Sequence, residues 1–211
     1  MTVDRVAVGP LSLPGRTVSV LGVALAVEAL VMVAYLLAAD PQILAPRYLV
    51  YPFVWMNVAL VAVLRAGSPR GGDRSRVVGA AVALAYLAVL SVTSGVVAES
   101  TALTGVRVVW PLPPGWGPAL LAGGAGLRVA LVPYEVLGYA ALAYLVYGTV
   151  VEARAVVGGA VGLVSCVGCT LPVAAGLVGA VVGGTAAVGA TTWVYDLSTV
   201  GYVAAVVLLS R

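Results

Sequence analysis

The sequence predicts an all-α integral membrane protein with six transmembrane helices and both termini in the cytoplasm. Of its 211 residues, 62% are hydrophobic and 9% are charged, whereas soluble domains carry about 25% charged residues. Its apolar runs are also long enough to cross a bilayer, which takes ~20 residues of helix. We therefore expect a single membrane domain, residues 1–211, that is embedded in the cell membrane as a multi-pass protein with the lipid bilayer as its partner.

The expected helices are apolar runs separated by polar or proline-rich connections. They cover about 17–39, 47–64, 77–97, 128–150, 155–182 and 186–209. The connection at 98–126 contains a Trp/Pro-rich segment, and its prolines exclude a regular helix there. Within it, residues 119–126 are a candidate for a partial dip into the membrane. As an alternative to two full spans, 155–182 and 186–209 form a re-entrant pair.

The distribution of arginine predicts the orientation. All 11 basic residues are Arg. Eight of them fall in the N-terminal segment, in the connections after the second and fourth helices, and at the C-terminus, whereas Arg47, Arg107 and Arg128 fall on the opposite side. Because cytoplasmic loops carry an excess of basic residues, both termini are expected inside.

The composition excludes several activities. The chain has no His, which removes imidazole ligation of haem, catalysis by Ser-His or Cys-His pairs, and the usual zinc sites. It has no Lys either, so a retinal Schiff base is excluded. The net charge of +3 comes from loop arginines and marks orientation, and we expect no nucleic-acid partner.

The segment most suggestive of chemistry holds both cysteines, Cys166 and Cys169, in a run without charged residues. Residues three apart share one face of a helix. Pro172 lacks an N–H and so frees the carbonyl of Gly168 between the two thiols, which predicts a helix break there. Three uses fit this arrangement: a soft-metal site for which Cu(I) is the best match, a reversible dithiol, or simple packing.

Three carboxylates lie at expected membrane depth: Glu28, Glu135 and Asp196. Each costs about 2.5–3.5 kcal/mol to insert, which makes it a functional candidate. The alternatives are pairing with Arg or protonation, and Arg128 is placed to serve Glu135 on one helical face. A hairpin of the last two helices would bring Asp196 beside the thiols, where it could accept their protons.

Three segments of the chain carry a family resemblance: 47–57, 114–118 and 165–170. They resemble an uncharacterised family of small haloarchaeal membrane proteins with no assigned activity, over most of the chain. The resemblance implies a polytopic topology and a setting near respiratory copper proteins. Locally, the Cys-x-x-Cys run is similar to quinone-linked thiol oxidases of the vitamin K epoxide reductase and disulfide-bond-forming families, and to membrane metal-uptake proteins. Those oxidases use a second cysteine pair, which this chain lacks.

Three functional hypotheses follow. In the first, a membrane accessory or carrier protein handles a soft metal, copper for a respiratory oxidase, with Cys166 and Cys169 as ligands. Met32 and Met56 are candidate thioether ligands, although methionine at helical spacing is usually core filling. In the second, the cysteines of a thiol–disulfide redox protein react with quinone or an external partner. In the third, the chain is a non-catalytic subunit of a membrane complex. On balance a non-enzyme is favoured.

Overall fold

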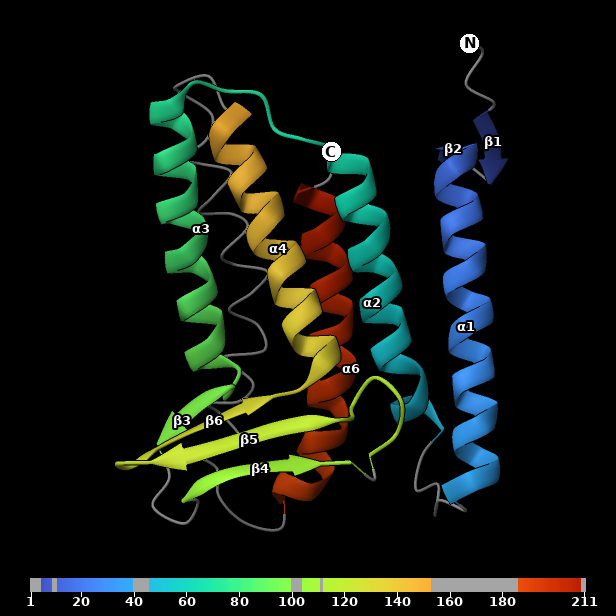
Figure 1. Cartoon of the computed structure of the whole chain (residues 1–211), viewed down its shortest axis with the longest axis vertical. Helices are drawn as coiled ribbons and strands as arrows, with labels where there is room; N and C mark the ends of the chain where they lie inside the picture. The colour runs from blue at the N-terminus through green and yellow to red at the C-terminus, as the bar shows by residue number, and fades with distance from the viewer. Residues whose placement is uncertain are drawn as a thin grey trace.

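The computed structural model describes residues 5–8, 11–39, 46–99, 104–110, 112–152 and 186–209. The helices are α1 (Gly15–Ala39), α2 (Arg47–Ala66), α3 (Asp73–Thr93), α4 (Pro133–Glu152) and α6 (Ala186–Leu209). The strands are β1 (Arg5–Val8), β2 (Leu11–Pro14), β3 (Val97–Glu99), β4 (Gly105–Val109), β5 (Ala119–Gly124) and β6 (Leu127–Leu131). The helices stand side by side, and strands β3 to β6 lie across one end of them (Figure 1).

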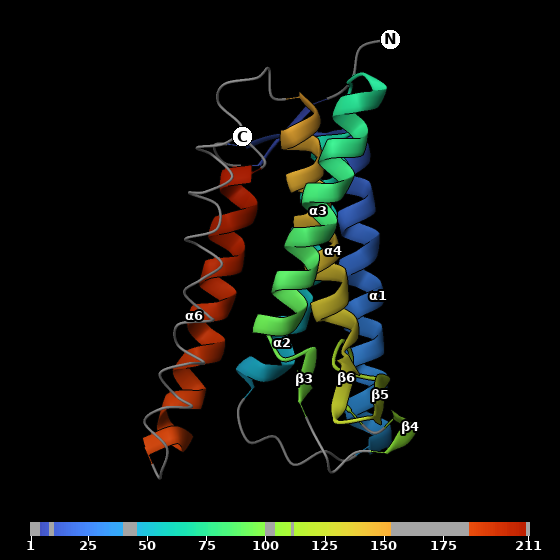
Figure 2. The same cartoon turned by 90° about the vertical axis from the view of Figure 1, so that its left-hand side faces the viewer.

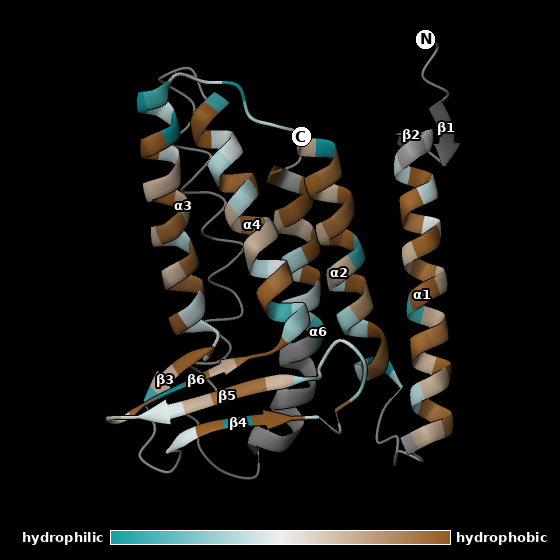
Figure 3. Cartoon of the chain, viewed as in Figure 1, coloured by the Kyte–Doolittle hydropathy of each residue, from teal (hydrophilic) through white to brown (hydrophobic). Residues whose placement is uncertain are grey.

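Four of the helices, α1 to α4, are long and apolar enough to cross a membrane by length and composition. Helix α6 carries a further apolar stretch, Ser198–Val207. Apolar residues run along the helices, whereas hydrophilic ones gather at helix ends and in the α2–α3 connection (Figure 3). A mostly helical architecture with membrane-length helices is thereby confirmed. The predicted helix at 155–182 lies outside the described residues.

The all-α prediction was wrong between α3 and α4. Strands β3 to β6 form an antiparallel sheet of four strands in the order β3-β6-β5-β4. The prolines that suggested an irregular connection fall between β4 and β5, and they leave the flanking runs free to pair. Ala125 and Gly126, with φ of 51° and 83°, form the two-residue turn of the β5–β6 hairpin, as the twist of such hairpins favours.

The sheet also moves two predicted helix ends. Helix α3 ends at Thr93 instead of residue 97, and α4 begins at Pro133 instead of residue 128. Proline suits the first turn of a helix, where its missing N–H has no intrahelical partner. Residues 128–131 therefore extend the β6 ladder and do not belong to α4. At the N-terminus, β1 and β2 form a second antiparallel pair before α1, in a segment where no element was expected.

Helices α1 to α4 alternate in direction along the chain, and α6 runs in the same direction as α4 (Figure 1). Helix α1 begins, and α6 ends, at the end of the molecule opposite the sheet, where the α2–α3 connection also lies (Figure 1). Helix α4 packs against both α3 and α2, α6 packs mainly against α2 and α4, and α1 contacts the other helices mainly through α2. The buried core lies where α2, α4 and α6 meet, around Trp55, Leu142 and Tyr202.

Gly138 allows α4 to approach this core closely. A Cβ atom added there would lie 2.6 Å from Cε3 of Trp55 and 3.4 Å from Cε2 of Tyr202. Both rings are buried, so neither has open space into which to move. The absence of a side chain at this position is therefore a packing requirement.

We predict that Gly138→Ala lowers the free energy of unfolding by about 1–3 kcal/mol, because overpacking strains a filled core. The matched control is Gly22→Ala on α1, where an added Cβ would meet no described atom within 4 Å. Thermal unfolding of both variants in detergent, followed by circular dichroism, measures the difference. Equal midpoints for the two variants would contradict the packing seen around Trp55.

Candidate functional site

The structure describes some of the sequence-predicted site residues. Cys166, Cys169 and Pro172 lie outside the described residues, so their expected geometry stays a prediction. The structure does place the three carboxylates and two methionines: Glu28, Glu135, Asp196, Met32 and Met56.

Asp196 joins α6 to the beginning of α2. Its Oδ1 accepts a hydrogen bond from the hydroxyl of Tyr51, and its Oδ2 lies 3.9 Å from Nη1 of Arg47. Arg47 is the first residue of α2, so this cluster lies toward the end of the bundle that carries the sheet. The sequence suggested no Arg partner for Asp196, although Arg47 was placed at the beginning of the second expected helix, on the side opposite the cytoplasm. The structure shows that an Arg at a helix end reaches it.

Glu28 and Asn57 form a polar contact between α1 and α2. Nδ2 of Asn57 donates to Oε2 of Glu28 at 2.6 Å and to the carbonyl oxygen of Phe53 at 2.8 Å. Oδ1 of Asn57 is buried and has no hydrogen-bond partner among the described residues. Both residues lie within membrane-length apolar helices. The pair therefore supplies a directional contact between α1 and α2.

Glu135 lies in the first turn of α4, where its charge is favoured by the positive end of the helix dipole. Its Oε1 accepts a hydrogen bond of 3.1 Å from the hydroxyl of its neighbour Tyr134. The proposed pairing with Arg128 along one helical face was wrong, because Arg128 belongs to strand β6 and not to α4. A helix N-terminus accounts for the position of this carboxylate.

The structure places Met32 on α1 and Met56 on α2. Met56 packs against the buried core and lies near Gly115, where an added Cβ would be 3.5 Å from the Met56 methyl carbon. Met32 is partly buried on α1. No cluster of three or more Cys, Asp or Glu residues that could hold a metal occurs among the described residues, which exclude both cysteines. Core packing therefore explains Met56.

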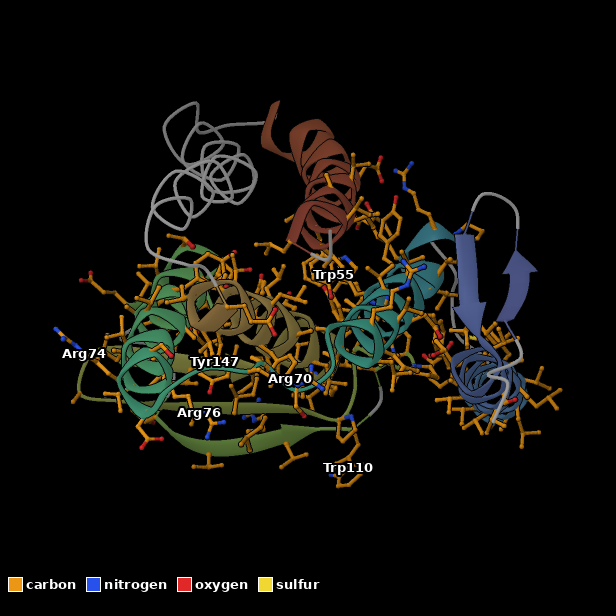
Figure 4. The ribbon with its side chains drawn as sticks, turned by 90° about the horizontal axis from the view of Figure 1, so that it is seen from above. Trp55, Arg70, Arg74, Arg76, Trp110 and Tyr147 are labelled. Carbon is orange, nitrogen blue, oxygen red and sulfur yellow. The ribbon has the colours of Figure 1, made fainter. Side chains whose placement is uncertain are left out.

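An aromatic cluster joins three helices around Trp55. Its ring stacks on Tyr202 with centroids 4.0 Å apart and planes 5° from parallel. Tyr134 and Tyr139 of α4 meet the same ring edge-on at 5.6 and 5.8 Å. Nε1 of Trp55 donates to Oγ1 of Thr199 at 3.2 Å. Figure 4 shows Trp55 between α2, α4 and α6. Buried aromatic pairs of these geometries contribute about 0.5–1.5 kcal/mol each beyond their area.

The Trp/Pro-rich segment docks onto the same cluster. Nε1 of Trp116 donates to the carbonyl oxygen of Tyr48 at 2.8 Å, and the Trp116 ring meets Tyr134 at 4.8 Å. The carbonyl oxygen of Gly115 accepts a hydrogen bond from the Tyr134 amide at 3.1 Å. A Cβ at Gly115, whose φ is +87°, would lie 2.4 Å from Cβ of Pro52. Segments 47–57 and 114–118, distant in sequence, are thus in direct contact.

These features define a mostly helical protein with helices of membrane-spanning length and a small sheet at one end, in which aromatic and polar contacts join the helices. The whole chain, residues 1–211, matches the model of a family of unknown function, DUF7546. The protein belongs to that family, which confirms the expected membership of an uncharacterised family. No curated protein and no solved structure matches the chain significantly.

We predict that Tyr51→Phe and Asp196→Asn each destabilise the protein by about 0.6 kcal/mol, the typical size of a hydrogen bond between membrane helices. The double variant should lose less than the sum, because both changes remove the same contact. Unfolding in mixed detergent micelles measures the cycle. Tyr35→Phe, whose hydroxyl has no hydrogen-bond partner among the described residues, is the control for hydroxyl loss. Additive losses would show that the two residues act independently.

Proposed function

We propose that the protein is a six-span membrane accessory or carrier protein, with both termini in the cytoplasm, that handles a soft metal through Cys166 and Cys169. The metal that best suits these ligands is Cu(I), and a respiratory oxidase of an archaeal host is the proposed destination. Thiolates select Cu(I) over harder cations, and Cys-x-x-Cys spacing brings two sulfurs to one ion.

The observation that carries the proposal is the position of the helices on either side of the cysteine segment. Helix α4 ends opposite the sheet, and α6 begins at the sheet end (Figures 1 and 2). Residues 153–185 therefore link opposite ends of the bundle, and they carry no charge after Arg154. A link of this kind, long enough for ~20 residues of helix, supports a further crossing with both thiols between the membrane surfaces.

The proposed orientation has support from the same arrangement. The end where α1 begins and α6 ends also holds the α2–α3 connection, which is bounded by Arg65 and Arg74. The sheet end holds Arg47, Arg107 and Arg128. The arginine-rich end is therefore the proposed cytoplasmic one.

A site of two thiolates suits delivery of a metal rather than its permanent storage, because open coordination positions allow a partner's ligands to take the ion. Asp196 would accept a thiol proton as the metal binds, and Glu28 and Glu135 are further proton-carrying candidates. Since Asp196 also contacts Tyr51 and Arg47, its proton uptake would loosen the join between α2 and α6. Metal loading would in this way be coupled to helix packing.

A second candidate is a non-catalytic subunit of a membrane complex. The position of α1 favours it: this helix contacts the other helices mainly through α2, and none of its membrane-length window is buried within the chain. Much of α1 is thus available to lipid or to a partner helix. The metal carrier requires Cys166 and Cys169 for its function, whereas the non-catalytic subunit does not.

We predict that protein purified without oxygen retains about one equivalent of copper, and that Cys166→Ser reduces this at least tenfold, because one thiolate binds a soft ion far more weakly than two. Metal content by mass spectrometry and a free-thiol count on the same sample provide the measurement. Ser165→Ala, next to the cysteine pair in the sequence, is the matched control.

The other outcomes separate the alternatives. Copper-free protein whose two thiols close reversibly with a quinone would replace the carrier with a redox protein. Inert thiols without metal would support the structural subunit. Full copper retention by Cys166→Ser would exclude the cysteine pair as the site.

We predict that a tag at residue 211 and a tag inserted between Ala125 and Gly126 are accessible from opposite sides of sealed membrane vesicles. The second position is the exposed turn of the β5–β6 hairpin. Antibody labelling before and after permeabilisation measures this. Labelling of both tags from one side would contradict the proposed crossing of the membrane.

A further inference from the structure

Strands β3 to β6 are held close to the membrane boundary by the helices that they connect. Strand β3 begins at Val97, soon after α3 ends at Thr93, and β6 ends at Leu131, just before α4 begins at Pro133. At about 3.3 Å per residue, these links allow little separation of the sheet from the helix ends. Viewed along the helix axes, the sheet lies to one side of the bundle and not beneath its centre (Figures 2 and 4). That lateral position is where the surrounding lipid would lie.

One face of this sheet is apolar and exposed. The strand register places Val106 beside Ala122, which is paired with Val129, and places Val108 beside Leu120, which is paired with Leu131. Because side chains alternate between faces along a strand, these residues share one face. Its most exposed apolar members are Val106, Val108, Trp110, Leu120, Leu127 and Leu131.

The exposure on this face is large where the sheet is farthest from the helices. Val106 is 74% exposed and Trp110 is 72% exposed, and Trp110 points away from the helix bundle (Figure 4). Contiguous apolar surface of this kind is rare on proteins that face only water. A polar exception, Glu99, lies at the margin of this face, opposite Leu127 on the edge strand β3.

The opposite face carries the basic residues of the sheet. Arg107 is paired with Leu121, and Arg128 is paired with Gly123. Both positions alternate with the apolar set, so both arginines belong to the other face, and both are exposed. The two arginines of the sheet thus lie on the face opposite the exposed apolar set, together with the smaller or less exposed apolar residues Val109, Ala119, Leu121 and Ala130.

We propose that the apolar face is a membrane-binding surface that rests on lipid acyl chains at the headgroup boundary, next to the transmembrane helices. It continues the apolar surface of the spans to which the sheet is joined, and Trp110 at its edge is of the residue type that favours this depth. The arginines on the other face are then directed to water and headgroup phosphates. Burial of these side chains in lipid removes their apolar surface from water, which stabilises this placement.

This surface would fix the depth and tilt of the bundle. Transmembrane helices are generally oriented by interfacial anchors and by packing against their neighbours. The inference requires a protein that spans the membrane but is independent of any metal at the cysteines. Failure of one proposal therefore leaves the other standing.

The test uses adjacent positions on the two faces. Spin labels are attached to Val106→Cys and to Arg107→Cys, each in the full chain carrying Cys166→Ala and Cys169→Ala. The protein is reconstituted in vesicles of phosphatidylcholine and phosphatidylglycerol. Collision with oxygen, which concentrates in lipid, is compared with collision with a water-soluble nickel chelate.

We expect the oxygen-to-nickel ratio to be several-fold higher at residue 106 than at residue 107. Equal ratios that report water at both positions would overturn the proposal. A label at 106 that is shielded from both agents and shows spin–spin broadening would also overturn it, because a second copy of the chain would then cover this face.

A second measurement avoids the cysteine replacements. Tryptophan fluorescence of the unaltered chain is recorded in vesicles with and without brominated lipid, and Trp110→Phe is compared with it. If Trp110 lies at the acyl boundary, the variant loses a strongly quenched component of the emission. An unchanged quenched fraction would contradict lipid contact at this position.

Discussion

The ring of Trp55 is the constraint on which the arrangement of the other elements depends. It lies flat against Tyr202 of α6 and meets Tyr134 and Tyr139 of α4 at their edges, so one α2 side chain sets the distances to two other helices. The ring occupies the space that any side chain at residue 138 would need. Because residue 138 is glycine, α4 can approach α2 this closely.

The same contact also positions the sheet. Tyr134, at the beginning of α4, touches Trp55 on one side and Trp116 on the other, and its amide bonds to the Gly115 carbonyl. The segment before β5 is therefore fixed to α2 and α4. A ring stack inside the bundle thus determines where the sheet can lie.

Much of the helical architecture could be predicted from the sequence, because long apolar runs are a strong signal for membrane spans. The boundaries of α1 and α2 were close to those observed, since charged or proline-rich connections mark them. The sheet was missed for a physical reason: strands β4 to β6 are short, and their apolar residues suit a helix as well as a strand. Pairing between these neighbouring strands decides between the two, and it is established only in the folded sheet.

The polar contacts show a similar limit. Glu28, Asn57 and Asp196 were recognisable because each is a polar residue in an apolar helix. Their partners were not, because a pair such as Tyr51 and Asp196 depends on which faces of two helices meet. Cys166 and Cys169 lie outside the described residues, so the predicted geometry of the cysteine segment stays a prediction.

The sequence separation of these contacts has a consequence for how the chain is made. Glu28 and Asn57 are 29 residues apart, so α1 and α2 emerge from the ribosome together and can enter the bilayer as a hairpin with the carboxyl group already paired. Tyr51 and Asp196 are 145 residues apart. Until α6 is synthesised, Tyr51 and Trp55 expose an aromatic and polar surface within the membrane. In a nascent chain that stops before α6, this surface therefore stays exposed. Proteases and chaperones that act on newly inserted proteins can bind there.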